Sequence, residues 1–299
     1  IKDFFCPESL LLDSHYIKRY IKQNFGFLKK YKEQNMNKKS IIGGGAGELT
    51  NLDMDIATAH KTNTNFWDTI GSEFLGATAL PYYGSFVTEE KLQLFGDVTN
   101  KKLLEIGCGN GHSLKYIIEK GAAELWGTDI SPMQLERTKE FLASNEMDAN
   151  LICAPMEREG GIPKQYFDYV YSVYAIGWTT DLNQTFCNIS SYLKKDGIFI
   201  FSWSHPIHKC VAVENEELIF RNSYFDEGWY SVAMADKEIM LSNRKLSTYV
   251  NALAANGFVI EQMVEETDED LLNPNLTDDF SKKAKQLPVT FVIQARKLE

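Results

Sequence analysis

From residue 101 onward, short apolar runs alternate with segments of helical periodicity, and this alternation limits the fold more than any other feature of the chain. The first five runs are four to six residues long and almost entirely apolar, which is typical of parallel strands buried on both faces of a sheet. The last run follows a polar loop without a clearly patterned helix, so we expect it to pair antiparallel with its neighbour. The sequence therefore predicts an α/β domain. The expected strands are 103–106, 124–127, 150–153, 169–173, 198–203, 258–264 and 289–295, and the expected helices are 112–119, 132–143, 182–193 and 244–256.

The composition fits one large folded domain or two small ones. The chain has 299 residues, of which 44% are hydrophobic, and a net charge of −10. An acidic chain is a poor candidate for binding the phosphates of nucleic acids, and no apolar run reaches the ~20 residues of a membrane span. The five cysteines are scattered without a C-x-x-C pair, and the first residues lack the order of a secretory signal. We therefore expect no disulfide framework, no metal site and a cytoplasmic location.

The first part of the chain differs from the rest in charge. Residues 1–40 hold nine basic and four acidic residues, and their apolar residues recur at helical spacing. This pattern predicts a basic amphipathic helix, which either packs on the main domain or binds an anionic membrane or a partner. Residues 40–62 are rich in Gly, Thr and Asn and are interpreted as a linker or irregular lid, followed by a helix at 65–79. The chain is thus divided into residues 1–62 and a domain of residues 63–299.

A glycine-rich turn, Gly107 to Gly111, follows the first expected strand and opens the first expected helix. Gly107 suits a tight turn, Gly109 lets the backbone approach a ligand closely, and Gly111 lets the helix start near the strand. The spacing is G-x-G-x-G, whereas dinucleotide-binding turns have G-x-G-x-x-G. No Lys-Ser/Thr pair follows the glycines, which excludes a triphosphate-binding loop. The turn therefore indicates a different nucleoside ligand.

Asp129 follows the second expected strand, 22 residues after Gly107. A carboxylate at this place can accept hydrogen bonds from the two hydroxyls of a ribose. The same side chain can also cap the helix that starts at Ser131, and the two roles are compatible. The glycines, the acid and the strand–helix alternation together predict a nucleoside-binding site.

With these motifs in place, residues 67–297 resemble the class I S-adenosylmethionine-dependent methyltransferases, in particular the type 11 enzymes that act on small molecules. Residues 105–111 are similar to the first motif of that family and Asp129 to its ribose-binding acid. Residues 167–172 are similar to its fourth-strand motif and residues 193–197 to the turn before its fifth strand. The resemblance implies a Rossmann-like, doubly wound sheet of seven strands, mostly parallel with an antiparallel last strand. It also implies S-adenosylmethionine as the cofactor and S-adenosylhomocysteine as its product.

The resemblance further implies which residues contact the methyl donor. Residues 154–157 follow the third strand, where the family lines the adenine, but the Asp that many members have near Ala154 is absent. Met156 or Glu157 is expected to take its place, and Tyr83 is expected to cover the donor from the segment before the first strand. Cys108 is interpreted as a small packing residue. The expected donor-binding residues are Tyr83, Glu105, Gly107, Cys108, Gly109, Asn110, Gly111, Asp129, Ile130, Pro155, Met156, Glu157, Ser172 and Val173.

Residues 205–243 interrupt the alternation over a length that far exceeds an ordinary connection, which predicts a lid inserted after strand five. Ligands of open α/β sheets lie beyond the carboxyl ends of the strands, so the residues after strands four and five are expected to face the methyl acceptor. His205 is hypothesised to be a general base or an acceptor-orienting group; a structural role at the strand end is an equal alternative. The expected acceptor-binding residues are Tyr174, Trp178, His205, His208, Tyr224 and Trp229.

The sequence favours an enzyme that methylates an oxygen or nitrogen atom of a small molecule. The acidic charge and the expected lid support this reading, and they make nucleic acid an unlikely partner. Transfer to RNA or protein is the second possibility. A protein that binds S-adenosylmethionine without turnover is the third, because no catalytic residue is certain. The identity of the acceptor and the oligomeric state are not specified by these patterns.

Overall fold

The computed structural model of the chain describes most residues from 55 onward. The expected basic helix within residues 1–40 lies outside the described residues, and so does the 71–77 part of the helix expected at 65–79. Within the described part of the chain, no helix is both long enough and apolar enough to cross a membrane. The described residues are 55–70, 78–234, 237–272 and 278–299.

A sheet of seven strands lies at the centre of the described residues, in the order β12-β13-β7-β6-β3-β4-β5. The strands from β7 to β5 pair parallel, whereas β13 runs antiparallel to both of its neighbours, β7 and β12. All seven strands expected from the sequence are present. The prediction of a mostly parallel sheet with an antiparallel last strand is therefore confirmed. The strands are β3 (Lys102–Ile106), β4 (Glu124–Asp129), β5 (Asn150–Cys153), β6 (Phe167–Ser172), β7 (Leu193–Ser204), β12 (Phe258–Val264) and β13 (Thr290–Lys297).

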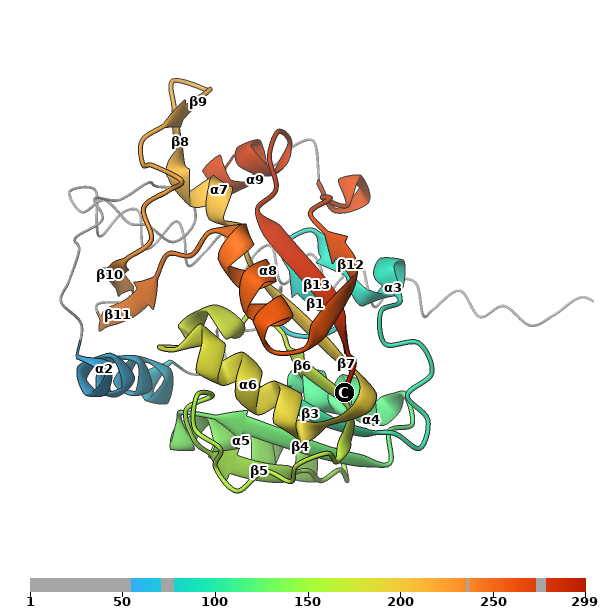
Figure 1. The fold of residues 1–299 in the computed structure, drawn as a ribbon. Helices are drawn as coiled ribbons and strands as arrows, with labels where there is room; N and C mark the ends of the chain where they lie inside the picture. Colours follow the sequence, from blue (N-terminus) through green and yellow to red (C-terminus); the bar gives the residue numbers. More distant parts are fainter. Residues whose placement is uncertain (1–54, 71–77, 235–236, 273–277) are drawn as a thin grey trace, which may run out of the picture. The chain divides into compact units, whose positions relative to one another are not determined.

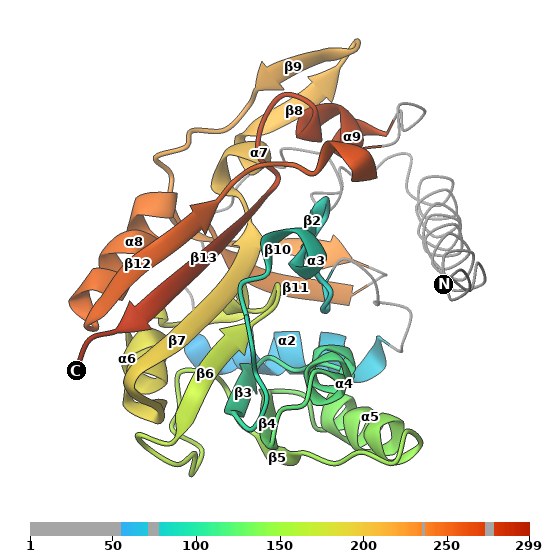
Figure 2. The same ribbon diagram turned by 90° about the vertical axis from the view of Figure 1, so that its right-hand side faces the viewer.

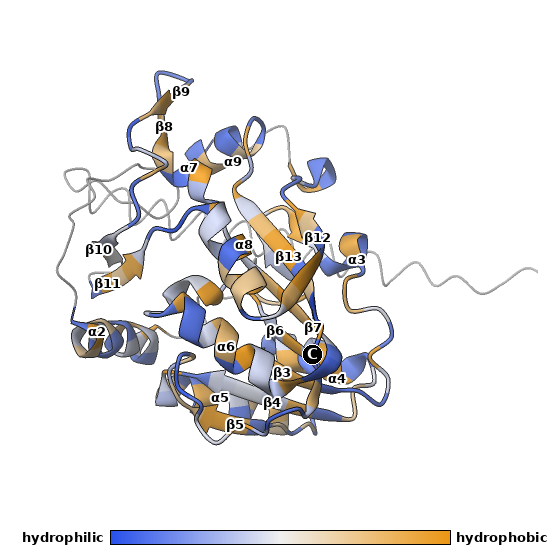
Figure 3. Ribbon diagram, viewed as in Figure 1, coloured by the Kyte–Doolittle hydropathy of each residue, from blue (hydrophilic) through white to orange (hydrophobic). Residues whose placement is uncertain are grey.

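Helices cover both faces of this sheet, α4 and α5 on one face and α6 and α8 on the other (Figures 1 and 2). Successive strand residues point to opposite faces, so each strand supplies two apolar clusters. Leu104 and Val170 belong to the cluster under α6 and α8, and Leu103 and Tyr171 belong to the cluster under α4 and α5. Hydrophobic colour is accordingly concentrated on the central strands in Figure 3. The helices are α4 (His112–Glu119), α5 (Pro132–Ala143), α6 (Leu182–Tyr192) and α8 (Leu246–Ala255).

Local signals fix the helix that follows β4. The hydroxyl of Ser131 caps α5 by accepting a hydrogen bond from the backbone N–H of Gln134, and Pro132 occupies the first helical position. Leu135 and Leu142 are buried against the sheet. Because cap, proline and apolar spacing agree, the helix has the bounds expected from the sequence.

The 205–243 insertion folds into a short helix and two antiparallel hairpins outside the main sheet (Figure 1). The apolar residues of this segment show no periodicity, because each strand is short and pairs only within its own hairpin. Its elements are α7 (Pro206–Cys210), β8 (Val211–Glu214), β9 (Glu217–Phe220), β10 (Trp229–Met234) and β11 (Lys237–Ser242). The remaining elements are β1 (Tyr82–Gly84), β2 (Val87–Thr88), α3 (Glu89–Leu92), η2 (Ile176–Trp178), η3 (Glu269–Leu271) and α9 (Asp279–Ala284).

Helix α2 (Ile56–Thr69) corrects two expectations. The described end of the expected 40–62 linker is helical, and the helix ends at Thr69, with an extended backbone at Ile70, instead of continuing to residue 79. Asp55 starts it by accepting the backbone N–H groups of Ala57 and Thr58. Thr and Asn have low helix propensity, so the sequence signal is weak and contacts with distant elements stabilise the helix.

Candidate active site

The chain bends sharply at the carboxyl end of β3, over residues 107–111, which we call the glycine bend. The backbone N–H groups of Gly107 and Cys108 both donate to the carbonyl oxygen of Thr128, at 2.8 and 2.9 Å. The φ angle of Gly107 is 76°, and a Cβ atom there would lie 2.4 Å from the Cβ of Ala175. Only glycine fits this position, because any side chain would clash with Ala175 and the residue would have to adopt a positive φ. The glycine at residue 107 is therefore what allows the chain to bend here.

The carboxylate of Asp129 holds the glycine bend from the end of β4. Its Oδ2 accepts the N–H of Gly109 at 3.0 Å, and its Oδ1 accepts the N–H of Ser131 at 2.9 Å. Burial raises the pKa of Asp129 to about 6, although these backbone N–H groups act in the opposite direction. The side chain therefore serves both the bend and the start of α5.

Two buried titratable groups lie in or beside the bend, Cys108 within it and Glu105 on β3. Glu105 is 2% exposed and accepts a hydrogen bond from the hydroxyl of Tyr171 at 3.4 Å. Burial raises the pKa of Glu105 and that of the Cys108 thiol well above their usual ranges. A thiol with a raised pKa stays protonated near neutral pH, so Cys108 has no nucleophilic character in this position.

The carboxyl ends of β6, β3 and β7 are joined by side-chain hydrogen bonds. The hydroxyl of Ser172 donates to the carbonyl oxygen of Ile106 at 2.9 Å, and the backbone N–H of Tyr174 donates to the hydroxyl of Ser202 at 3.0 Å. Val173, between them, is buried. These expected site residues therefore lie at one edge of the sheet, next to the glycine bend.

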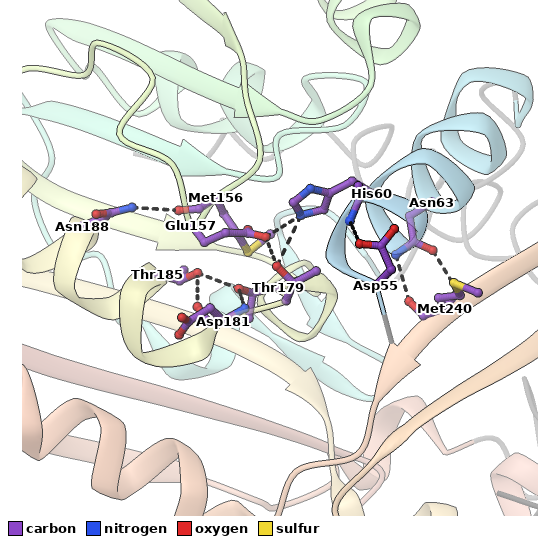
Figure 4. A network of polar contacts seen from close by, with 12 residues as sticks. Asp55, His60, Asn63, Met156, Glu157, Thr179, Asp181, Thr185, Asn188 and Met240 are labelled. Atoms are coloured by element: carbon purple, nitrogen blue, oxygen red, sulfur yellow. Dashed lines mark hydrogen bonds and ion pairs between the residues drawn. The ribbon is translucent and has the colours of Figure 1, made fainter. Parts of the chain in front are cut away.

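A polar network connects α2 with the loop after β5 (Figure 4). His60 on α2 lies with its Nε2 2.5 Å from the carboxylate Oε1 of Glu157, and the hydroxyl of Thr180 donates to the same oxygen. Burial acts to raise the pKa of Glu157, but the hydrogen bonds with His60 and Thr180 hold it below its ordinary value. Asn63 exchanges two hydrogen bonds with the backbone of Met240 on β11, at 2.8 and 2.9 Å. One helix thus contacts both the loop after β5 and the insertion.

The two histidines of the insertion have different surroundings. His205 is buried and caps α7 through Nδ1, while its Nε2 lies 2.6 Å from the Oε1 of Glu265. Its pKa is lowered by burial, against the effect of Glu265. His208 is also buried, and its Nε2 lies 2.6 Å from the hydroxyl of Ser204. Burial lowers the pKa of His208 well below its usual range, and its Nδ1 has no partner among the described residues.

The remaining residues expected to contact the donor lie in the core beside Glu89, where Tyr83 is placed, and in the segments after β4 and β5. Tyr83 is fully buried, and its hydroxyl donates to Glu89 at 2.7 Å, so its side chain is engaged within the core. The loop after β5 lies beside the end of β4, because the N–H of Ala154 donates to the carbonyl oxygen of Asp129 at 3.0 Å. The expected residues on these two strand ends are Ile130, Pro155, Met156 and Glu157.

The residues expected to contact the acceptor are also divided. Tyr174 and Trp178 both pack against Trp203, with ring centroids 5.1 and 6.2 Å apart. Tyr224 and Trp229 lie in the insertion, where the Tyr224 hydroxyl accepts a backbone N–H at the start of α8 and Trp229 begins β10. The structure therefore gathers an aromatic cluster after β6 and β7 and places the other two residues in the insertion.

Comparisons with known proteins identify the family. The family model described as Methyltransferase domain matches residues 104–201, from β3 to β7. An uncharacterized protein of Haemophilus influenzae is 30% identical over 220 residues, which are 70% of this chain and 85% of that protein. The chain belongs to the class I S-adenosylmethionine-dependent methyltransferases. This methyltransferase is therefore an enzyme with S-adenosylmethionine as its cofactor.

Two further comparisons cover most of this methyltransferase. A Saccharophagus degradans protein named ubiquinone biosynthesis O-methyltransferase is 24% identical over 84% of this chain and 98% of its own length. A crystal structure of a Listeria monocytogenes protein, titled a putative S-adenosylmethionine dependent methyltransferase, covers 71% of this chain and 97% of its own. Its TM-score is 0.59 at 23% identity, which shows a shared fold.

The residues at the glycine bend of this methyltransferase fit the donor. A Cβ atom built on Gly109 would have no described atom within 4 Å, so the backbone there faces open space. Each oxygen of Asp129 accepts one backbone hydrogen bond and retains a lone pair for a ribose hydroxyl. The buried Oδ1 of Asn110 has no partner among the described residues and can accept a hydrogen bond from a donor group of the ligand.

The role of α2 in this methyltransferase was missed by sequence reasoning. The contacts of His60 and Asn63 depend on elements far along the chain, which no local pattern reveals. One signal was available: Asp55, a favoured N-cap residue, stands directly before the helix. A search for caps within the Thr- and Asn-rich segment would have found the start of α2.

Proposed function

We propose that this methyltransferase transfers the methyl group to an oxygen or nitrogen atom of a small molecule. The supporting observation is the cover beside the carboxyl ends of the strands. Asn63 on α2 binds the backbone of Met240 on β11, and Arg244 donates to the carbonyl oxygens of Gly177 and Thr179 after β6. A site covered by a helix and a hairpin suits a small acceptor better than a folded macromolecule.

Two other observations support a small acceptor. The net charge of −10 opposes binding of an RNA backbone. The relative from Saccharophagus degradans, named for O-methylation in ubiquinone biosynthesis, is similar along nearly its whole length. A methyl acceptor of low molecular weight is consistent with both.

Methyl transfer of this kind needs no covalent bond between the protein and the reactants. When bound, S-adenosylmethionine supplies a methyl group on a positively charged sulfur, from which the acceptor atom displaces it in line. Positive charge is lost in this step, so positioning and exclusion of water supply most of the rate enhancement. The glycine bend and Asp129 hold the nucleoside in this proposal, and α2 with β10–β11 excludes water. The proton of the acceptor passes to a base, for which His205 remains the hypothesis; because its Nδ1 caps α7 and its Nε2 contacts Glu265, it would take the proton only by giving up one of these contacts.

Two measurements test the proposal. Calorimetry with S-adenosylhomocysteine measures binding at the glycine bend. A screen with methyl-labelled S-adenosylmethionine then compares small-molecule alcohols, phenols, carboxylic acids and amines with RNA and protein. We expect label in a small molecule alone. Label only in RNA or protein, or no binding of either nucleoside, contradicts the proposal.

A further inference from the structure

A pocket lies within the insertion, apart from the glycine bend. It is formed by one side of α7, the segment after β9, and the residues between β11 and α8. Its lining includes two tyrosines, Tyr224 and Tyr230, from the insertion. Two basic side chains complete it, Lys209 on α7 and Arg244 before α8. Aromatic and basic groups therefore meet in one pocket of an otherwise acidic protein.

Neither basic side chain of this pocket pairs with a carboxylate among the residues that the structure describes. Lys209 is half-buried, donates to the hydroxyl of Tyr230 at 3.1 Å, and lies 5.7 Å from the ring centroid of Trp203. Arg244 is half-buried too; it donates to two carbonyl oxygens of the main chain, at 3.3 and 2.6 Å, and contacts the hydroxyl of Tyr249. A half-buried cation without an anionic partner favours an anionic ligand, since charge is costly to bury alone.

The acidic side chains near the pocket do not neutralise Lys209 and Arg244. Glu214 pairs with Arg221, and Glu227 pairs with Lys245 at 3.1 Å. Asp226 lines the pocket, but it is exposed to solvent, and no ion pair joins it to either pocket cation in the described part of the chain. The local balance is therefore positive toward the interior of the pocket and negative at its rim.

The pocket is connected to the edge of the sheet where the donor is held. Arg244 binds the carbonyl oxygens of Gly177 and Thr179, and Ala175 of the same segment lies against Gly107 of the glycine bend. Lys209 lies over Trp203, which packs against the residues that follow β6. The segment 175–179 therefore contacts both Arg244 of the pocket and the glycine bend.

We propose that this pocket binds an anionic group, carboxylate or phosphate, of the small-molecule acceptor. The inference rests on the proposed function and deepens it, because it assigns the acceptor to the class of organic acids. A guanidinium has five N–H groups, so Arg244 keeps donors for either group besides those on the carbonyl oxygens of Gly177 and Thr179, and Lys209 adds a point charge. The rings of Tyr224 and Tyr230 can pack against an aromatic or other unsaturated group that carries the acid.

Binding of three small probes tests the proposal. Benzoate, phenyl phosphate and the neutral benzamide share one ring and differ in their charged group. Each is titrated into the full chain in the presence of S-adenosylhomocysteine, and two-dimensional NMR follows the amide signals of the pocket. We expect benzoate or phenyl phosphate to bind at millimolar concentration and to shift signals of the pocket, and benzamide to bind at least tenfold more weakly. The stronger of the two acids distinguishes carboxylate from phosphate.

Variants of two lysines, Lys209 in the pocket and Lys282 outside it, test the charge and provide the control. Lys209→Met should weaken the bound acid at least tenfold, whereas Lys209→Arg, which keeps the charge, should retain most of the affinity. Lys282→Met removes the same charge from α9, where Lys282 pairs with Glu216, and should change the affinity less than twofold. Calorimetry with S-adenosylhomocysteine on every variant shows that the donor site is intact.

The outcomes separate this inference from the proposed function. Equal binding of benzoate, phenyl phosphate and benzamide, no binding of either acid, or an unchanged affinity in Lys209→Met overturns the pocket assignment while donor binding stands. A true acceptor without an acidic group overturns it as well. Loss of S-adenosylhomocysteine binding in the unmodified chain counts against the proposed function itself.

Discussion

Replacement of Asp129 by Ala should reduce donor affinity about a hundredfold. The carboxylate accepts the N–H groups of Gly109 and Ser131, at 3.0 and 2.9 Å, and each of its oxygens retains a lone pair. A hydrogen bond to a charged group contributes about 1.5–3 kcal/mol. Two such bonds from the ribose hydroxyls, at the lower value, give about 3 kcal/mol, which corresponds to a factor of about 100 in the dissociation constant.

The same side chain predicts how donor affinity depends on pH. Burial raises the pKa of Asp129 to about 6, so the side chain is protonated in acid and ionised above neutrality. Only the ionised form accepts hydrogen bonds from both hydroxyls. Affinity is therefore full at pH 8 and falls as the pH drops through 6, to about one tenth at pH 5 if only the ionised form binds.

Calorimetry with S-adenosylhomocysteine between pH 5 and 8 measures both effects. Asp278→Ala is the matched control, because Asp278 also accepts two backbone N–H groups, of Phe280 and Ser281, where it caps α9. Loss of that cap should cost about 1 kcal/mol of stability and leave donor affinity unchanged. Unchanged donor affinity in Asp129→Ala, or a flat pH profile of the unmodified chain, would refute the reasoning.

Three other replacements test separate parts of the site. Gly111→Ala should lower the free energy of unfolding in urea by about 1–3 kcal/mol, because φ is 81° and the new Cβ would lie 2.7 Å from Thr138; an unchanged midpoint contradicts this. Glu157→Gln weakens the contact with His60 and should cost about 1–2 kcal/mol in the same assay, so equal stability argues against the network. His205→Asn keeps a helix cap, and should lower kcat by about 10²–10⁴ at unchanged donor affinity if His205 is the base; full turnover removes it from the mechanism.

The sheet was predictable from sequence because its signals are local. The strand at 150–153 has the bounds expected from its apolar run, and α5 begins where a cap and a proline coincide. The glycine bend was predictable for the same reason. Its glycines alternate directly between an apolar strand and a helix, and Gly107 has the positive φ that such a turn requires.

Contacts between distant residues were not predictable in this way. The helix α2 contains residues of low helix propensity and is held by partners about one hundred or more positions away, Glu157 and Met240. The partner of His205, Glu265, lies 60 residues further along the chain. Such pairs are formed by the tertiary fold, so a single sequence shows each residue without its partner.

The position of α2 has a consequence for how far the chain can be shortened. The helix holds the loop after β5 through His60, the hairpin through Asn63, and the start of α5 through Asp68, which accepts the hydroxyl of Ser131 at 2.6 Å. A fragment that starts at residue 63 would keep Asn63 and Asp68 of α2 but would lose His60 and its contact with Glu157. In such a fragment we expect the loop after β5 to lose one of its anchors, while the contacts of α2 with the hairpin and with α5 persist.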